Sequence, residues 1–452
     1  MRCLAKTVAL LAMMVGLAVN TPCAHAQLSL SSAVEMALRN DPRVKAAEAN
    51  VTKAQAVTSE VHDAYVPTVG IGGGYGKSTG PPLGLPTVFS ISSESLVFNF
   101  AQHDNILAAQ AGLESAKLAL REAKQQVEED VVLTYVSLAG AQEMKTTLND
   151  EESCAARLAT IVNDRVGAGL DTQIELLKSN RNATQIRLLA LQQEDTMADQ
   201  EAHLMRIMGL TGRHIEALPS TIPAMPEVSA LIRDNSLSFG VQAAFEDARS
   251  RNDIASGQSK YLYRPQISLV GNYSRLNTSP SESNFLVYYP TFAGKSNNDA
   301  AIAIQIQIPL FDRAHQARAL EASADAKHAM FDAESQKNLF LDEREKERHT
   351  MAELVARAEL ANDDRQIAQM QLNAVLAQLT ANNAATGATP MTPKDEQNAR
   401  LDERQKYADF LSTQQDLQRS TIRLMRETGQ LDSWLKNELH KPTAQTSFST
   451  KP

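Results

Sequence analysis

Few stretches of this sequence combine residue types and spacing that could do chemistry, and the most suggestive one is rich in glycine. Residues 70–78 read GIGGGYGKS and end in the Gly-Lys-Ser of a phosphate-binding loop. That motif requires a glycine where Ile71 stands, and it requires a helix next, whereas Pro81 and Pro82 follow. The glycines are better explained as residues that let a strand bend.

No catalytic or metal-binding constellation stands out in the rest of the chain. The nine histidines lack the spacing of His-Glu-x-x-His, and no set of Ser, His and Asp is evident. We therefore expect a protein that is not an enzyme and that holds no metal and no cofactor.

Two acidic residues, Glu175 and Asp395, occupy matching places in an internal duplication. The hexapeptides 204–209 and 424–429 both begin Leu-Met-Arg and end in glycine, and the offset of 220 residues between them also relates Glu175 to Asp395. Each acid follows a threonine in the pattern Thr-x-x-acid, which is the capping box of a helix start. Capping alone would account for both acids.

The N-terminal residues predict export. Arg2 and Lys6 precede an apolar run over residues 8–19, and a small-residue cleavage pattern follows, so residues 1–26 are expected to be a signal peptide. Cys23 could mark a lipid anchor, but the residues before it are a poor lipidation context. Soluble export is therefore favoured over lipid anchoring.

The composition narrows the possible partners. The chain carries a formal net charge of −9 over 452 residues, and losing Arg2 and Lys6 would make it more acidic. An acidic chain argues against nucleic acid and against an anionic membrane surface as partners. Cys154 would be the one remaining cysteine, so no internal disulfide framework is expected.

The elements that follow form two copies of one plan: a helix, a strand pair, a long helix, a tip and a returning helix. The strand pairs are expected within 68–100 and 266–309, and the long helices, of 66 residues each, over 102–167 and 314–379. The boundaries are a first repeat over 27–210, a linker over 211–229, a second repeat over 230–435 and a disordered tail over 436–452.

The predicted strands have an apolar face that needs a covering partner, and their length favours a membrane as that partner. Ile302, Ile304 and Ile306 alternate with small or polar residues, which is the pattern of a sheet with one apolar face. A half-buried soluble sheet is the commoner meaning, but strands of about 9 to 11 residues suit a bilayer. Membrane strands must close into a barrel, and known barrels begin at about eight strands. Four strands per chain would therefore require an oligomer.

Taken together, these features resemble the TolC-like outer-membrane efflux protein family over nearly the whole mature chain. The resemblance rests on the duplicated plan and on a Tyr-x-Pro turn into each strand pair, at Tyr65 with Pro67 and at Tyr263 with Pro265. It also rests on three local patterns, namely Phe311-Asp312, residues 165–170 (RVGAGL) and residues 429–435 (GQLDSWL).

The resemblance implies a mainly α fold with a small β part. A long antiparallel helical barrel would lie in the periplasm, and four strands per chain would contribute to a shared oligomeric outer-membrane β-barrel. The implied partners are two further copies in a homotrimer, outer-membrane lipid, a periplasmic adaptor protein and an inner-membrane pump. The implied function is a passive outer-membrane channel in a tripartite efflux or type I secretion system. A soluble periplasmic coiled-coil adaptor or scaffold is the alternative.

The resemblance also implies that acidic side chains ring a periplasmic aperture. The matching positions are Glu175 and Lys178 in the first repeat, and Asp395 and Asn398 in the second. A carboxylate ring would attract cations and make the aperture sensitive to charge. Lys178 departs from this pattern, because it puts a positive charge where an acid or amide would be unsurprising. The transported substrate and the class of pump are not specified by the sequence. Neither is the role of the aromatic loop over 276–299.

Overall fold

The computed structural model describes residues 26–74, 87–211, 215–226, 236–276, 298–380 and 392–439. The predicted signal peptide up to residue 25, the possible lipid-anchor position Cys23 and most of the aromatic loop lie outside these ranges. None of the helices in the described ranges combines the length and the hydrophobicity that a transmembrane helix requires.

The chain packs into two units, and each unit takes segments from both halves of the sequence. Unit 1 comprises Met1–Lys45, Ala123–Ser236 and Asp342–Pro452, and unit 2 comprises Ala46–Glu122 and Leu237–Leu341. The two sequence repeats are therefore copies of one plan rather than separate compact domains. Their long helices, α4 (Phe100–Gly167) and α9 (Arg313–Thr380), have 68 residues each, close to the predicted 66, and contribute to both units.

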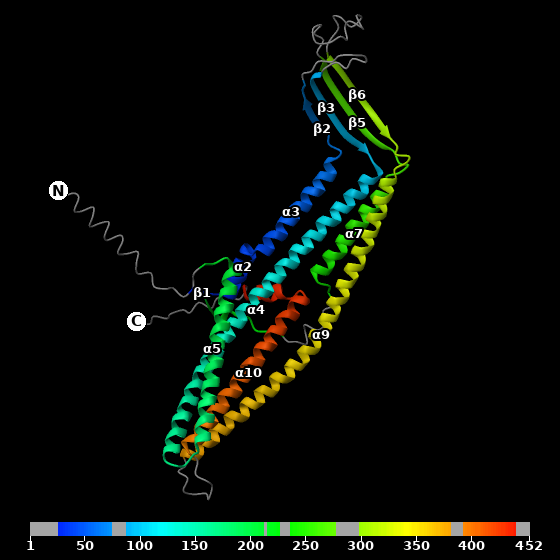
Figure 1. The fold of residues 1–452 in the computed structure, drawn as a ribbon. Coiled ribbons are helices and arrows are strands. Elements are labelled where there is room, and N and C mark those ends of the chain that lie inside the picture. The colour runs from blue at the N-terminus through cyan, green and yellow to red at the C-terminus, as the bar shows by residue number, and fades with distance from the viewer. Residues whose placement is uncertain are drawn as a thin grey trace, which may run out of the picture. The chain divides into compact units, whose positions relative to one another are not determined.

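Unit 2 contains a four-stranded antiparallel sheet in the order β2-β3-β5-β6 (Figure 1). The strands are β2 (Thr68–Gly72), β3 (Thr87–Phe98), β5 (Gln266–Leu276) and β6 (Asn298–Gln307). All four predicted strands are present, and the pairing of β3 with β5 joins the two repeats. The second strand was predicted to extend to residue 100, but it ends at Phe98, and Phe100 already begins α4. The shorter helices of this unit are α3 (Pro42–Asp63), which begins in unit 1, and α7 (Phe239–Ser259).

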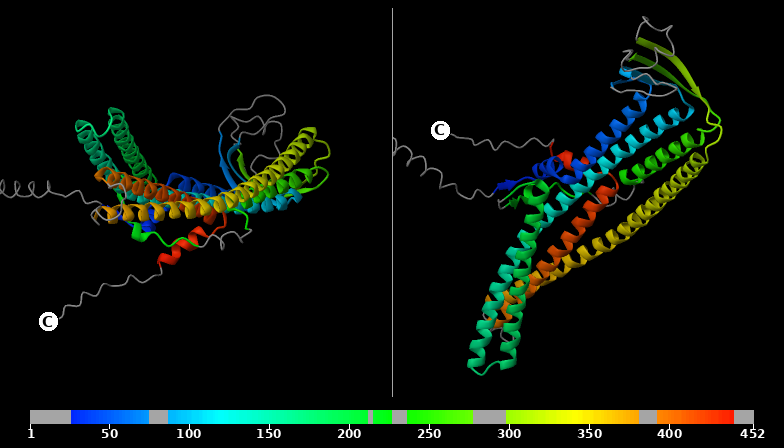
Figure 2. Two further views of the ribbon diagram at one scale, coloured as in Figure 1. Left: turned by 90° about the horizontal axis from the view of Figure 1, so that it is seen from below. Right: turned by 45° about the horizontal axis from the view of Figure 1, so that its top comes forward.

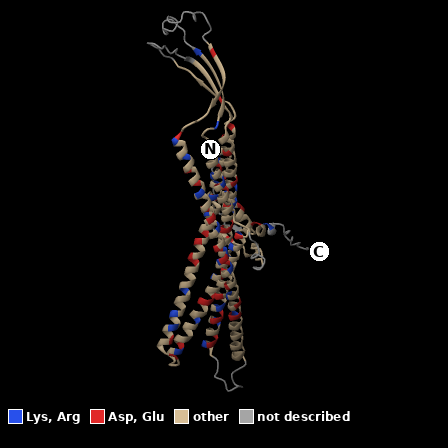
Figure 3. Cartoon of the chain, turned by 90° about the vertical axis from the view of Figure 1, so that its right-hand side faces the viewer, with Lys and Arg blue, Asp and Glu red and all other residues tan. Residues whose placement is uncertain are grey.

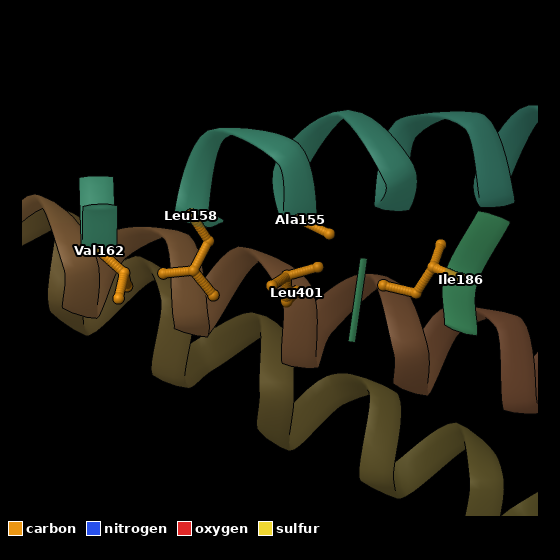
Figure 4. Close-up of a cluster of buried hydrophobic side chains, with 5 residues drawn as sticks. All are labelled: Ala155, Leu158, Val162, Ile186 and Leu401. Carbon is orange, nitrogen blue, oxygen red and sulfur yellow. The ribbon is translucent and has the colours of Figure 1, made fainter. Parts of the chain in front are cut away.

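Unit 1 is a layer of helices that run side by side (Figures 1 and 2). Alongside the later parts of α4 and α9 it holds α2 (Leu30–Asn40), α5 (Gln173–Met208) and α10 (Pro393–Glu427). Figure 4 shows one of its apolar contacts, a buried cluster formed by Ala155, Leu158 and Val162 of α4, Ile186 of α5 and Leu401 of α10.

The duplicated hexapeptides end the two returning helices in the same way. Gly209 after α5 and Gly429 near the end of α10 have φ values of 70° and 68°, in the left-handed region. Each glycine N–H donates to the carbonyl of the arginine of its own hexapeptide, Arg206 or Arg426. Glycine adopts this backbone without a Cβ penalty, which explains why both copies keep it.

The predicted linker is more structured than the sequence suggested. Residues 215–217 form β4 (Ile215–Ala217), which pairs in parallel with β1 (Ala26–Leu28), and η1 (Pro219–Thr221) follows. The fully buried Tyr135 of α4 holds this segment, because its hydroxyl donates to Leu28 O at 2.6 Å and accepts from Leu218 N at 2.8 Å. The linker therefore packs on the helices instead of merely connecting the repeats.

The C-terminal end also differs from the expectation. A helix, α11 (Leu431–Leu439), continues past residue 436, where the sequence suggested that a disordered tail begins. Trp434 anchors it, with its indole Nε1 donating to Ala224 O at 3.1 Å. Residues 440–452 of the predicted tail lie outside the described ranges.

Glu128 of α4 is expected to make the stability of unit 1 depend on pH. Its side chain is buried, its Oε2 finds no hydrogen-bond partner in the described part of the chain, and burial together with the nearby negative charge of Asp432 raises its pKa to about 7. We expect Glu128→Gln to stabilise the protein by about 2 kcal/mol at pH 8, because the variant avoids burying a charge.

The gain from Glu128→Gln should shrink as the pH falls through 7 towards 5, because the folded wild-type protein then takes up the proton that relieves the penalty. Denaturant unfolding at pH 8 and pH 5 checks this. An equal gain at both pH values would contradict the buried-charge explanation.

Candidate functional site

The sheet of unit 2 has one mainly apolar face and one small or polar face. The register places Ile71, Ile91 and Tyr273 opposite one another, and likewise Leu269 and Ile304. The intervening positions form the other face, which includes Gly70, Ser92, Glu94, Asn272, Ala301, Ala303 and Gln305. The alternation predicted for β6 thus extends across all four strands.

The apolar face is uncovered in the described chain. The side chains of Ile302, Ile71 and Ile304 are exposed to 84%, 74% and 69%. In Figure 3 the positions coloured as Lys, Arg, Asp or Glu are frequent along the helices and rare along the strands. Apolar surface on this scale is normally covered by a partner or by lipid.

The edges of the sheet are also open. β2 and β6 are the outer strands, and each pairs with one neighbour only in the described chain. A long edge strand left unpaired is a site for pairing with another chain. Two parts of the sheet therefore have no partner in the described chain: its apolar face is uncovered, and its edge strands are unpaired on their outer side.

The predicted helix-to-strand corners lie where a helix gives way to a strand in each repeat. Tyr65 and Pro67 lie between α3 and β2, and Ser95 Oγ donates to Tyr65 O at 2.8 Å. Tyr263 and Pro265 lie between α7 and β5, and Tyr263 N donates to Pro309 O at 3.0 Å. Hydrogen bonds that involve the backbone of Tyr65 and of Tyr263 thus hold both corners, while the two tyrosine side chains are exposed.

A cluster of charged side chains joins the turn after α4 to the start of α10; we call it the tip cluster. Asp171 lies at its centre, with Oδ2 at 2.9 Å from Arg165 Nε and at 3.1 Å from Lys394 Nζ. Glu175 lies 3.6 Å from Lys394 Nζ and 3.6 Å from Lys178 Nζ. The pairs to Lys394 connect segments that are more than 200 residues apart in sequence.

The two acids predicted from the duplication have different roles. Asp395 closes its capping box, because its Oδ2 accepts from Thr392 N at 2.8 Å and from Thr392 Oγ1 at 2.7 Å. The backbone N–H of Glu175 donates to Thr172 Oγ1 at 3.3 Å. The Glu175 carboxylate, however, pairs with Lys178 and Lys394 rather than with its threonine. Asp395 is therefore mainly a helix cap, and Glu175 belongs to the ion-paired network.

Hydrogen bonds and cations keep two acids of the tip charged. The pKa of Asp171 is lowered chiefly by its hydrogen bond from Arg165 and then by Lys394. The pKa of Asp395 is lowered chiefly by its hydrogen bonds from Thr392. Both carboxylates therefore stay ionised at neutral pH.

The other two predicted positions contribute less. Lys178 is 70% exposed at its side chain and forms an ion pair only with Glu175 in the described chain. Asn398 is exposed and makes no hydrogen bond or ion pair there. Arg165, Asp171 and Lys394 were not among the site residues predicted from the sequence. Arg165 belonged to a quoted pattern, but nothing local indicated that Lys394 would meet it.

Apolar side chains lie beside the tip cluster. Leu170, Ile174 and Leu177 are exposed to 66%, 64% and 62%. Ile174 and Leu177 are three positions apart in α5 and so lie on one face of that helix, and Leu170 belongs to the turn that precedes it. The end of the α4–α5 hairpin thus presents apolar side chains next to a network of ion pairs.

Comparisons with known proteins agree with this architecture. Residues 33–210 match the sequence profile of a family described as "Outer membrane efflux protein". Protein CyaE of Bordetella pertussis is 25% identical over 323 residues, which is 68% of this chain, and the match spans 65% of the length of that curated relative.

Solved structures share the fold at low sequence identity. The outer-membrane channel OprN superposes with a TM-score of 0.71 at 16% identity, covering 90% of each chain. The CmeC outer membrane channel of Campylobacter jejuni gives 0.68 at 14% identity, over 90% of this chain and 89% of that one. The outer membrane protein VceC of Vibrio cholerae gives 0.63 at 17% identity, over 91% and 95%.

OprN and CmeC are both described as outer-membrane channels. Residues 33–210 thus carry the pattern of the outer membrane efflux protein family, and the chain has the fold of solved outer-membrane channels over 90% of its length.

Proposed function

We propose that this protein is a passive duct through the outer membrane, serving a tripartite efflux or type I secretion system. A homotrimer would close the strands of three chains into one β-barrel, and the helices would line a periplasmic conduit. A periplasmic adaptor and an inner-membrane pump would supply the cargo and the energy. No transported substrate is proposed.

The two-faced sheet carries this proposal. Its apolar face suits lipid, its small and polar face suits a water-filled lumen, and its open edges β2 and β6 suit pairing between copies. Pairing β6 of one chain with β2 of the next would remove every exposed edge in a closed ring. A soluble adaptor would have no use for an uncovered apolar sheet.

The tip supports the proposed partners and the proposed gate. Ion pairs that join the α4–α5 turn to the start of α10 would hold these two hairpin ends together, and Glu175 would contribute charge to the aperture. The exposed Leu170, Ile174 and Leu177 would dock the adaptor. Asp395 and Asn398 would have at most a secondary part in the gate.

Two measurements test the duct. Purified protein reconstituted in a planar bilayer should conduct ions, and the native protein should resist extraction from outer membranes by carbonate or urea. Mock-purified fractions from cells lacking the protein control for contaminating porins. Protein released by carbonate, or intact oligomers without conductance in any bilayer, would count against the proposal and favour the adaptor or scaffold alternative.

A further inference from the structure

A hollow of about 640 Å³ lies in unit 1 between α4, α5 and α10. The three helices run alongside one another in Figure 1, and each contributes residues to the lining of the hollow. The polar groups that line it include Ser137, Asp199, His203, Arg206, Arg419 and Arg423. We call it the basic hollow.

Its positive charge is incompletely neutralised. Arg206 and Arg423 are exposed, and neither makes an ion pair within the described chain. Arg419 donates from Nε to Ser137 Oγ at 3.0 Å, and its nearest carboxylate, that of Asp416, is 3.7 Å away. Asp199 is the one acid that lines the hollow.

The contrast with neighbouring arginines makes the excess meaningful. Arg426 lies one helical turn beyond Arg423, and its Nη1 is 2.6 Å from Glu129 Oε2. Arg43 is paired with both Asp41 and Asp130. In a chain with a formal net charge of −9, Arg206 and Arg423 thus place two guanidinium groups without an ion pair in the described chain around one hollow.

The duplication explains how the hollow arose. The offset of 220 residues relates His203 to Arg423 and Asp199 to Arg419. Equivalent positions of the two returning helices thus face the same hollow, and the second repeat carries arginine at both. This placement concentrates the charge of the second repeat beside α4.

The hollow opens away from the segment that covers the other side of α4. Tyr135 holds residues 215–221 there, and Ser137 lies about 200° further around the helix. Residues 215–226 and α11 lie on one side of the helical layer in Figure 2. If the layer is the wall of a duct, as proposed above, these segments would obstruct the bore from the inside, so the basic hollow faces the lumen.

We propose that the basic hollow binds multiply charged oxyanions, the phosphate or carboxylate groups of small solutes that pass through the lumen. Two guanidinium forks without a protein partner can each bind an oxyanion through paired N–H donors, and the Ser137 hydroxyl adds a polar contact. The site would make this part of the wall favour anions. The lumenal position rests on the proposed function, whereas the binding chemistry does not.

Inorganic phosphate and citrate are suitable probes for calorimetric titration of the full-length protein in detergent. We expect both probes to bind the wild-type protein and the double variant Arg206→Gln with Arg423→Gln to bind them about tenfold more weakly or worse, because both free guanidinium groups are lost. Double replacement by lysine should give an intermediate affinity, since charge remains but the planar fork does not.

Arg357→Gln is a matched control, because Arg357 is an exposed arginine of unit 1 that pairs locally with Glu353 at 2.6 Å. It should bind both probes like the wild-type protein. No binding by the wild-type protein, or equal binding by the glutamine double variant, would overturn the site. Circular dichroism and the oligomer size show whether each variant is folded.

A bilayer measurement separates this proposal from the duct itself. In a salt gradient the glutamine double variant should shift the reversal potential towards cation preference relative to the wild-type protein. Conductance without probe binding would overturn the basic hollow and leave the duct intact. Probe binding that depends on Arg206 and Arg423 in a protein that never conducts would support the hollow and overturn the duct.

Discussion

Ile302→Arg is expected to prevent stable assembly of the protein in the outer membrane. Ile302 lies in the middle of β6 on the apolar face and is 84% exposed. On a lipid-facing surface, arginine costs about 2–4 kcal/mol near the bilayer midplane. Each copy in a homotrimer would bear this cost, so the population of inserted oligomer should fall by at least about tenfold. Carbonate extraction followed by native electrophoresis of the membrane fraction measures the loss.

Ala303→Arg is the matched control for this experiment. Ala303 is the next residue of β6, is exposed and belongs to the small or polar face that would line water. Its arginine variant should assemble almost normally. Equal loss in both variants would point to a general defect of the strand, and equal retention would show that the apolar face does not meet lipid.

Removing the tip carboxylates is expected to have the second large effect. The double variant Asp171→Asn with Glu175→Gln breaks the ion pairs to Arg165, Lys394 and Lys178 without changing side-chain size. If these pairs hold a closed aperture, the open population and with it the mean current per channel should rise about tenfold. Planar bilayer recording of the purified oligomer measures this change.

Asp364→Asn provides the control for the tip variant. Asp364 of α9 pairs with Lys406 of α10 at 3.0 Å, so this change also breaks an ion pair between helices of unit 1, but away from the tip cluster. Its conductance should match that of the wild-type protein. A tip variant with unchanged conductance would leave Asp171 and Glu175 as purely structural residues.

If the tip cluster holds the aperture closed, we expect the wild-type conductance to depend on pH. Because the pKa of Asp171 is depressed in the folded protein, its contribution to holding the tip together is present above the usual value of 3.8. The contribution is lost as the pH falls through the depressed value. Conductance should therefore stay low from pH 7 to pH 5 and should rise only below about pH 4.

Local signals in the sequence determined most of the elements. Gly209 and Gly429 ended the two returning helices because a left-handed C-cap strongly favours glycine. Likewise, Thr392 with Asp395 marked a helix start, and the alternation around Ile304 marked a strand. Such signals lie within a few residues of one another, so they act through backbone geometry that any window of the chain reveals.

Contacts between distant segments could not be obtained in this way. Lys394 meets Asp171 across 223 positions of the sequence, and the linker pairs with β1 because Tyr135 binds both of them. Each partner alone has an ordinary local explanation, as a helix-end charge, a turn or a core tyrosine. Their meeting depends on how the helices pack.

The same distinction between local signals and distant contacts applies to the functional surfaces. The sequence by itself determined the duplicated plan, the apolar alternation of β6 and the resemblance to outer-membrane efflux proteins. Only the tertiary structure decided that Glu175 joins an ion-pair network while Asp395 closes a cap. It also brought Arg206 and Arg423 to one hollow. The reason is that salt screens electrostatic interactions between exposed charges over about 10 Å, so the role of a charge depends on its neighbours in space.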